Sequence, residues 1–194
     1  MGYIKDIVDR RQKLAIGRTE QIKETGLTGS SYFEASDAYL TRELELARRL
    51  ADLFDVPDLE YREHVLHREE AFSDARGGIT NVLSGIGITH IAVIDSSRDV
   101  TRGNHYHPHG HQFMYLVSGA YEALSVPADQ LGEEAPAVHL EWVRAGDLVY
   151  CPPGVAHAYR FTEPSLFLNL TTDPGRAPGD FDKHTIKALL TRGD

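Results

Sequence analysis

The 194-residue sequence has very little cysteine and no long apolar run. Its single cysteine, Cys151, excludes an internal disulfide, so the reducing cytoplasm is the expected compartment. No stretch is long and apolar enough to span a bilayer, and none is typical of a signal peptide, so we expect no membrane partner. Basic residues are also scarce, with 20 Lys and Arg against 29 Asp and Glu and a formal charge of −9. Without a basic face to neutralise phosphates, a nucleic-acid partner is not expected.

The first 60 residues predict a helical extension. A short helix is expected over residues 4–14, followed by a loop that contains Gly17, Gly26 and Gly29. Over residues 37–54 apolar side chains recur at three- and four-residue steps, and Pro57 lies just past the end. This amphipathic stripe is more typical of a face that packs against a barrel or a partner subunit than of a membrane face, because its polar side has no basic excess.

After residue 60 the sequence changes to short strands bounded by Gly, Pro, Asp or Ser. They are expected at residues 61–67, 79–82, 88–95, 112–118, 121–126, 138–144, 148–151, 157–161 and 165–171. Eight or nine such strands predict a mainly β protein with a double-sheet jelly roll. We therefore expect a helical extension at 1–60, a barrel at 61–176 and a C-terminal tail at 177–194.

Four histidines fall within seven residues, at positions 105, 107, 109 and 111, at the foot of a hydrophobic run. Side chains on a strand alternate between faces, so His105 and His107 point the same way, roughly 6.6 Å apart along the chain. Imidazole is the commonest transition-metal ligand. A metal site normally takes about three or more protein ligands, so further ligands must come from elsewhere in the chain.

Two positions can supply them. Gln112 opens the apolar strand that ends at Gly119, and its carboxamide oxygen can face the same cavity. Downstream, Gly146 and the turn at residues 152–154 flank a short strand and aim His157 from the start of the next one.

The two blocks resemble the two defining motifs of the cupin superfamily. The first reads His105-x-His107, four residues, Gln112, six residues, Gly119; the second reads Gly146, five residues, Pro152-x-Gly154, two residues, His157. The resemblance implies a double-stranded β-helix, the cupin jelly-roll barrel. Three positions depart from the pattern: Asp99 stands for a glycine, Phe161 for an asparagine, and Gln112 for the usual carboxylate ligand.

We therefore predict that one divalent transition metal (Fe, Mn, Ni, Co or Zn) is bound through His105, His107, Gln112 and His157. A neutral Gln112 leaves more positive charge on the metal than a glutamate would, which favours acidic bound water or an anionic ligand. His111 is the rival fourth ligand and would give an all-histidine site. The alternative is a solvated histidine-rich turn, with adventitious metal or none.

A narrower resemblance covers residues 72–172. The segments 72–77 (Phe-Ser-Asp-Ala-Arg-Gly), 102–107 and 152–157 are similar to motifs of cupins that isomerise or epimerise nucleotide-linked sugars. The resemblance implies proton removal and return beside a carbonyl by a His and a Tyr, with the His pair acting on substrate rather than on metal. The candidate catalytic residues are His105, His107, Tyr115 and Tyr159. Arg76 and Arg102 are candidates for binding an anionic substrate, with a surface salt bridge as the alternative for each.

The expected function is thus a metal-binding cupin, of isomerase or epimerase type, that acts on a small-molecule sugar or sugar nucleotide. An Fe(II)-dependent dioxygenase is the rival enzyme class, because imidazole and oxygen ligands with open positions suit O₂ chemistry. A non-catalytic small-molecule-binding cupin is the third possibility. A homodimer is expected because one small barrel does not fully cover the stripe of residues 37–54.

Overall fold

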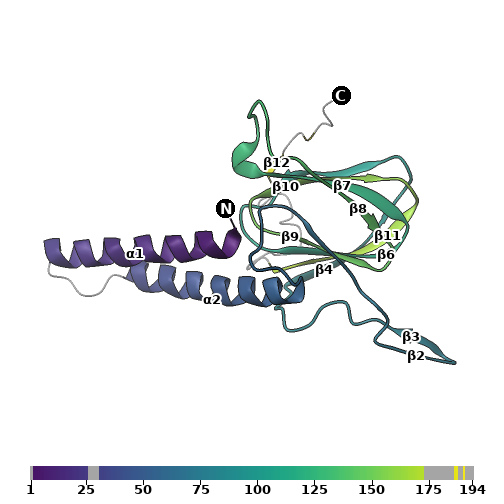
Figure 1. Ribbon diagram of the computed structural model, residues 1–194, viewed down its shortest axis with the longest axis horizontal. Coiled ribbons are helices and arrows are strands. Elements are labelled where there is room, and N and C mark those ends of the chain that lie inside the picture. The colour runs from purple at the N-terminus through teal and green to yellow at the C-terminus, as the bar shows by residue number, and fades with distance from the viewer. Residues whose placement is uncertain (1, 26–30, 173–185, 188–189, 191–194) are drawn as a thin grey trace. The chain divides into compact units, whose positions relative to one another are not determined.

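The computed structural model describes residues 2–25, 31–172, 186–187 and 190 (Figure 1). The chain divides into two compact units between Glu60 and Tyr61, where the sequence changes from helical to strand periodicity. Within the described ranges, no helix is long and apolar enough to cross a membrane.

The first unit is a pair of helices of 23 residues each, α1 (Tyr3–Thr25) and α2 (Ser31–Leu53). The predicted end of the first helix near residue 14 is wrong, because α1 continues through Gly17. A glycine inside a helix costs only about 1 kcal/mol relative to alanine, which the packing of α1 against α2 can offset. Gly26 and Gly29, the other glycines of the predicted loop, lie outside the described residues. The apolar stripe of the second helix is a buried face, but within this unit α2 packs against α1, whereas a barrel or a partner subunit was expected to cover the stripe. Its buried members are Leu40, Leu44, Ala47, Leu50 and Ala51.

The second unit is built from two five-stranded antiparallel sheets, which confirms the predicted double-sheet jelly roll. Sheet 1 has the order β1-β9-β6-β11-β4 and sheet 2 the order β12-β5-β10-β7-β8. The strands are β1 (His64–His67), β4 (His90–Ser96), β5 (Thr101–Tyr106), β6 (Gln112–Ser118), β7 (Ala120–Pro127), β8 (His139–Arg144), β9 (Asp147–Cys151), β10 (Val155–Phe161), β11 (Ser165–Thr171) and β12 (Ile186–Lys187). A 3₁₀ turn, η1 (Ala128–Gln130), follows β7.

A separate hairpin, β2 (Phe72–Asp74) and β3 (Gly77–Ile79), lies between β1 and β4 in the chain and extends away from the two large sheets (Figure 1). All six of its residues are exposed. The predicted strand at 79–82 is displaced, because the turn at 75–76 allows residues 77–79 to pair with residues 72–74, so that the strand starts two residues earlier than predicted. Most of the predicted tail at 177–194 lies outside the described residues, but β12 pairs with β5 at Tyr106 and His105.

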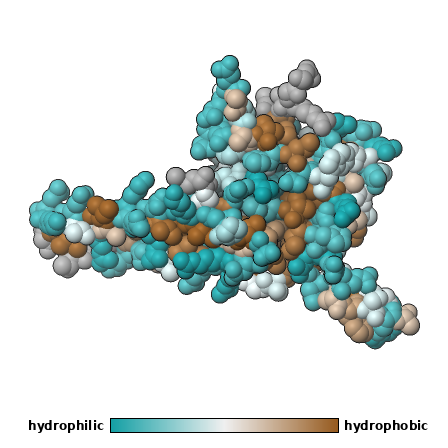
Figure 2. All heavy atoms as spheres, viewed as in Figure 1, coloured by the Kyte–Doolittle hydropathy of each residue, from teal (hydrophilic) through white to brown (hydrophobic). Residues whose placement is uncertain are grey.

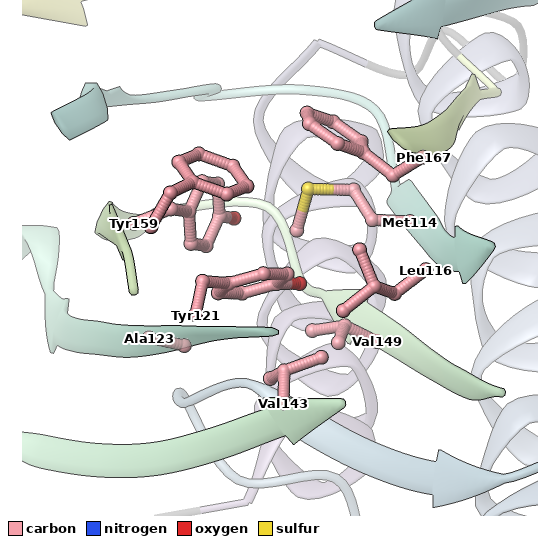
Figure 3. Close-up of a cluster of buried hydrophobic side chains, with 9 residues drawn as sticks. Met114, Leu116, Tyr121, Ala123, Val143, Val149, Tyr159 and Phe167 are labelled. Atoms are coloured by element: carbon pink, nitrogen blue, oxygen red, sulfur yellow. The ribbon is translucent and has the colours of Figure 1, made fainter. Parts of the chain in front are cut away.

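The barrel core lies between the two sheets (Figure 3). Its buried members are Met114, Leu116, Tyr121, Ala123, Val143, Val149, Tyr159, Phe161 and Phe167. Full burial of a large apolar side chain contributes roughly 1.5–3 kcal/mol, so this cluster is a main source of the barrel's stability. It also identifies which face of each strand points inward, since side chains alternate along a strand.

Candidate functional site

A polar layer crosses the inner face of sheet 1 at one end of the core. Gln112 lies two residues before the core residue Met114 and therefore points inward. It is in register with Cys151 on β9 and with Thr171 on β11, and Thr171 is in register with His90 on β4. This row of side chains lies directly beyond the apolar cluster.

The facing row on sheet 2 carries the histidines. His157 precedes the core residue Tyr159 by two positions, and its register partners are His105 on β5 and Ser125 on β7. The ligand nitrogens of His105, His107 and His157 all lie within 4.8 Å of one another. Their ring centroids are separated by 4.9 Å for the 105–107 pair, 4.7 Å for 105–157 and 5.8 Å for 107–157. The structure thus brings together the three histidines that the two sequence motifs select.

An irregularity in β5 makes this approach possible. Gly103 and Asn104 have φ angles of 82° and 56°, and the pairing with β10 shifts register between His157 and Ala158. A Cβ on Gly103 would lie 2.8 Å from the carbonyl oxygen of His157, which is closer than real contacts allow. Only glycine therefore permits the two strands to approach closely beside the histidines.

His157 is fully buried, and burial lowers its pKa well below the ordinary value, with a further lowering from His105 and His107. Its ring is therefore neutral near pH 7, the form that binds metal. Nδ1 lies 3.1 Å from the Sγ of Cys151. Within the described part of the chain, the buried Nε2 makes no hydrogen bond. One ring nitrogen is thus held by the protein and the other is left for a ligand.

Gln112 is buried and its amide is oriented by Asn169. Its Nε2 donates to Oδ1 of Asn169 at 2.8 Å. Its Oε1 is buried and has no hydrogen-bond partner among the residues that the structure describes. The oxygen is therefore the end of the amide that remains for a metal or a substrate.

His111, the rival ligand, lies elsewhere. Its Nδ1 is 2.8 Å from the hydroxyl of Tyr150, and its ring stacks on that tyrosine. Phe113 stacks on the same ring, and alternation along β6 places Phe113 on the face opposite to Gln112. Of the two alternatives for a fourth ligand, only Gln112 is on the inner face.

Glu63 was not identified from the sequence, yet it is buried beside His157. The hydroxyl of Tyr159 donates to its Oε1 at 2.5 Å, and the ring of Tyr159 stacks on His157. Ligand atoms of Glu63, Cys151 and His157 lie within 4.8 Å of one another. Burial raises the pKa of Glu63 to about 8, in spite of the opposing hydrogen bond from Tyr159. Nothing in the local sequence marks Glu63, because its neighbours come from strands β9 and β10.

The remaining predicted site residues are not brought to the histidines within one chain. Tyr115 alternates with the core residues Met114 and Leu116, so it lies on the outer face of sheet 1. The guanidinium of Arg102 donates to the Ser96 hydroxyl at 2.6 Å and to the carbonyl of Asp95 at 2.8 Å, at the far end of β4 from His90.

Arg76 lies at the exposed hairpin. Its guanidinium pairs with Asp74 at 2.5 Å, and its side chain is 86% exposed. The pair lowers the pKa of the Asp74 carboxyl below its ordinary value, which keeps that carboxylate charged. Within one chain the structure therefore places this predicted anion-binding residue on an element outside both sheets of the barrel.

The three imidazoles, together with the buried carboxamide oxygen of Gln112 on the facing sheet, would offer a neutral donor set of the kind that suits divalent first-row transition metals. The buried atoms without protein partners, Nε2 of His157 and Oε1 of Gln112, fit such a group, because buried polar atoms normally meet a protein group, a water or an ion. The same imidazoles, without metal, could transfer protons directly.

No protein-family model matches the sequence, and no curated protein matches it. Solved structures resemble the fold. A dTDP-4-dehydrorhamnose 3,5-epimerase from Sulfolobus tokodaii matches with a TM-score of 0.53 and 17% identity, over 63% of this chain and 74% of that chain. The corresponding enzyme from Bacillus anthracis, with TDP and PPi bound, gives 0.53 and 15%, over 66% and 78%. A 3′-monoepimerase from Streptomyces bikiniensis, in complex with dTDP-quinovose, gives 0.51 and 20%, over 66% and 79%. At these identities the likeness shows a shared fold.

Proposed function

Because this chain has the cupin jelly-roll fold, we propose that it is a metal-binding enzyme of isomerase or epimerase type that acts on a sugar or sugar nucleotide. The observation that carries the proposal is the convergence of three imidazoles, with ligand nitrogens within 4.8 Å of one another. The unpartnered Oε1 of Gln112, buried on the facing sheet, supports it.

In this proposal His105, His107, Gln112 and His157 hold one divalent cation. When bound there, a divalent cation would provide Lewis-acid polarisation of a substrate carbonyl oxygen. Since all four ligands are neutral, the full charge of the cation is available for that role. The chain keeps His157 neutral through burial and fixes its ring through the contact of Nδ1 with Cys151.

Isomerisation or epimerisation of a keto sugar requires removal and return of a proton beside the carbonyl. The half-buried His105 can be reached from solvent, which makes it the candidate base if the histidine pair acts directly on substrate. Of the two candidate tyrosines, Tyr159 contacts His157, and burial raises its pKa so that it keeps its proton. Tyr159 is therefore the better-placed candidate acid, with its hydroxyl donating to Glu63 in the absence of substrate, and Tyr115, on the outer face, is the weaker one.

A sugar nucleotide is the favoured substrate class for two reasons. The epimerases that share the fold are described with dTDP sugars or with TDP, and three segments of this sequence are similar to motifs of that group. A diphosphate needs cationic partners on a chain whose formal charge is −9. Arg76 is the more accessible candidate, since Arg102 is bonded to Asp95 and Ser96.

An Fe(II)-dependent dioxygenase is the second candidate. The donor set of three imidazoles with one neutral oxygen leaves coordination positions open, which suits O₂ chemistry. Oxygen consumption with an oxidisable metabolite would favour it. Metal binding with neither reaction would favour a non-catalytic small-molecule-binding protein.

The first experiment is elemental analysis of the full-length protein purified without a histidine tag, with melting curves after addition of Fe, Mn, Ni, Co or Zn. About one first-row metal per chain, or a higher melting temperature with at least one of these ions, supports the proposal. If the protein contains no metal and none of these ions changes its melting temperature, the metal has no place in the proposed function.

A further inference from the structure

The side chain of Asn169 is the one group in the described residues that bonds the amide of Gln112. Gln112 and Asn169 face the barrel interior from neighbouring strands, where Met114 is in register with Asn169 and Gln112 with Thr171. The two amides are therefore diagonal neighbours on one face, close enough for the 2.8 Å bond from Nε2 to Oδ1. Both side chains are buried, so bulk water does not compete for this bond.

The orientation of the Gln112 amide decides what it can do. A carboxamide has an acceptor oxygen and a donor NH₂ that exchange places when the terminal bond rotates. Only the oxygen has a lone pair for a cation. With Nε2 held by Asn169, Oε1 is the end that is left without a protein partner, as far as the structure is described.

We propose that Asn169 is a positioning residue that turns the Gln112 oxygen toward the three histidines. This inference rests on the proposed metal site and adds a residue that the cupin motifs do not contain. Asn169 does not itself touch the cation. It acts by accepting from Gln112, and groups that orient metal ligands in this way typically change metal affinity by about 10- to 100-fold.

The test uses Co²⁺ alone as the probe on the full-length, metal-free protein. Calorimetry gives the Kd, and the visible absorption of bound Co²⁺ reports the coordination geometry. Asn169→Leu removes the acceptor, and we expect the Kd to weaken by about 10- to 100-fold with a changed visible spectrum. Asn169→Asp keeps an acceptor and has no donor, so it can hold only the Nε2 end of Gln112. We expect N169D to retain the wild-type spectrum and to bind Co²⁺ at least as tightly.

Two further variants separate positioning from a general structural effect. Leu168→Ala alters the same strand on its opposite face and should leave the Kd unchanged. Gln112→Ala should weaken binding as much as N169L, and the double variant should lose no more than either single one. If N169L does not fold, as judged by circular dichroism, Asn169→Ala takes its place.

The outcomes distinguish this inference from the proposed function. If the wild-type protein does not bind Co²⁺, the metal site itself is overturned, and Asn169 has nothing to position. If the wild type binds and N169L has the same Kd and spectrum, or the two losses are additive in the double variant, the role of Asn169 is overturned and the metal site stands.

Discussion

His157 links the three-histidine group to the interior of the barrel. It approaches His105 and His107 on one side, meets Cys151 through Nδ1, and stacks on Tyr159. Because it is fully buried and contacts both Cys151 and Tyr159, its position is fixed by the barrel itself. A side chain held in this way can bind a cation without losing much conformational entropy, which is the physical basis of preorganisation.

His157→Ala should therefore abolish metal binding. The change removes the ligand whose ring the barrel already holds in place, and it leaves two imidazoles with a neutral carboxamide, which is a weak ligand. His109, by contrast, is exposed in the turn after β5, and His109→Ala should bind metal as the wild type does. Calorimetric titration of both variants with Zn²⁺ measures this. Equal weakening in the two variants would point to adventitious binding by the histidine-rich turn.

Glu63 leads to a prediction about pH. Its pKa is raised by burial from 4.5 to about 8, so the folded protein binds this proton more tightly than the unfolded chain does. The free energy of unfolding should therefore fall as the pH rises from 4.5 to about 8 and level off above that. Glu63→Gln cannot ionise and should lack this decrease. Between about pH 5 and about pH 8 its stability relative to the wild type should therefore increase by on the order of a few kcal/mol.

Urea denaturation of the metal-free protein, carried out at about pH 5 and about pH 8, gives the comparison. The difference in stability between E63Q and the wild type should grow with pH over this range. A difference that is the same at both pH values would mean that Glu63 titrates normally.

At the scale of single elements, the sequence predicted those strands and helices that have a regular apolar pattern and a regular backbone. The strands expected at 112–118 and 165–171 match β6 and β11 to the residue, because each is an apolar run bounded by Gly, Ser or Pro. β5 was not among the expected strands as an element, since its six residues, Thr101–Tyr106, include no aliphatic side chain and two positive φ angles. The helix expected at 4–14 is too short because glycine disfavours a helix interior only weakly, and α1 continues through Gly17.

The same distinction holds within the site. His105, His107 and His157 could be selected from motif spacing, because each lies at a fixed distance from turn residues. Glu63 and Asn169 could not, because their bonds join residues 96 and 57 positions apart and depend on strand pairing. The positions of Arg76 and Arg102 also depend on tertiary structure, since short motifs do not specify which partner a guanidinium finds.

Gly17→Ala should stabilise α1. The position is inside a regular helix, and an added Cβ would lie 3.8 Å from a ring carbon of Phe33, an ordinary contact. We expect a gain of about 0.5–1 kcal/mol, seen as a higher midpoint when thermal unfolding is followed by far-UV circular dichroism. Gly103→Ala is the matched control and should be destabilising, because there the Cβ would meet the backbone of β10 at a positive φ. A lower midpoint for G17A would contradict this account of the helix.

At the scale of the whole molecule, the reason to expect a homodimer has changed. The apolar stripe of α2 is buried in the described structure, so its exposure is no longer a reason to expect a partner subunit. Hydrophobic side chains nevertheless reach the surface of the molecule (Figure 2). On β4, which is an edge strand of sheet 1, Ile91 is 61% exposed and Val93 is 68% exposed. An apolar edge strand is a ready surface for pairing with a second copy.

We therefore still predict a homodimer, now through β4. Light scattering at micromolar concentration should give about twice the monomer mass, and Val93→Lys should shift it to the monomer. Val138→Lys, which adds the same charge next to β8 on the other sheet, should leave the dimer intact. A wild-type monomer at this concentration, or a loss of the dimer in V138K alone, would count against this surface.

The central claim, a metal-assisted proton transfer on a sugar nucleotide, is tested most directly by solvent exchange. The protein is incubated in D₂O with a dTDP-linked 4-keto sugar, and NMR follows the carbon-bound proton beside the carbonyl. The account predicts that deuterium replaces this proton with the metal-loaded protein, that exchange stops after chelation, and that it returns when the metal is restored. Exchange that continues after complete metal removal would contradict the role of the metal, and no exchange with the loaded protein would contradict the isomerase proposal for this substrate class.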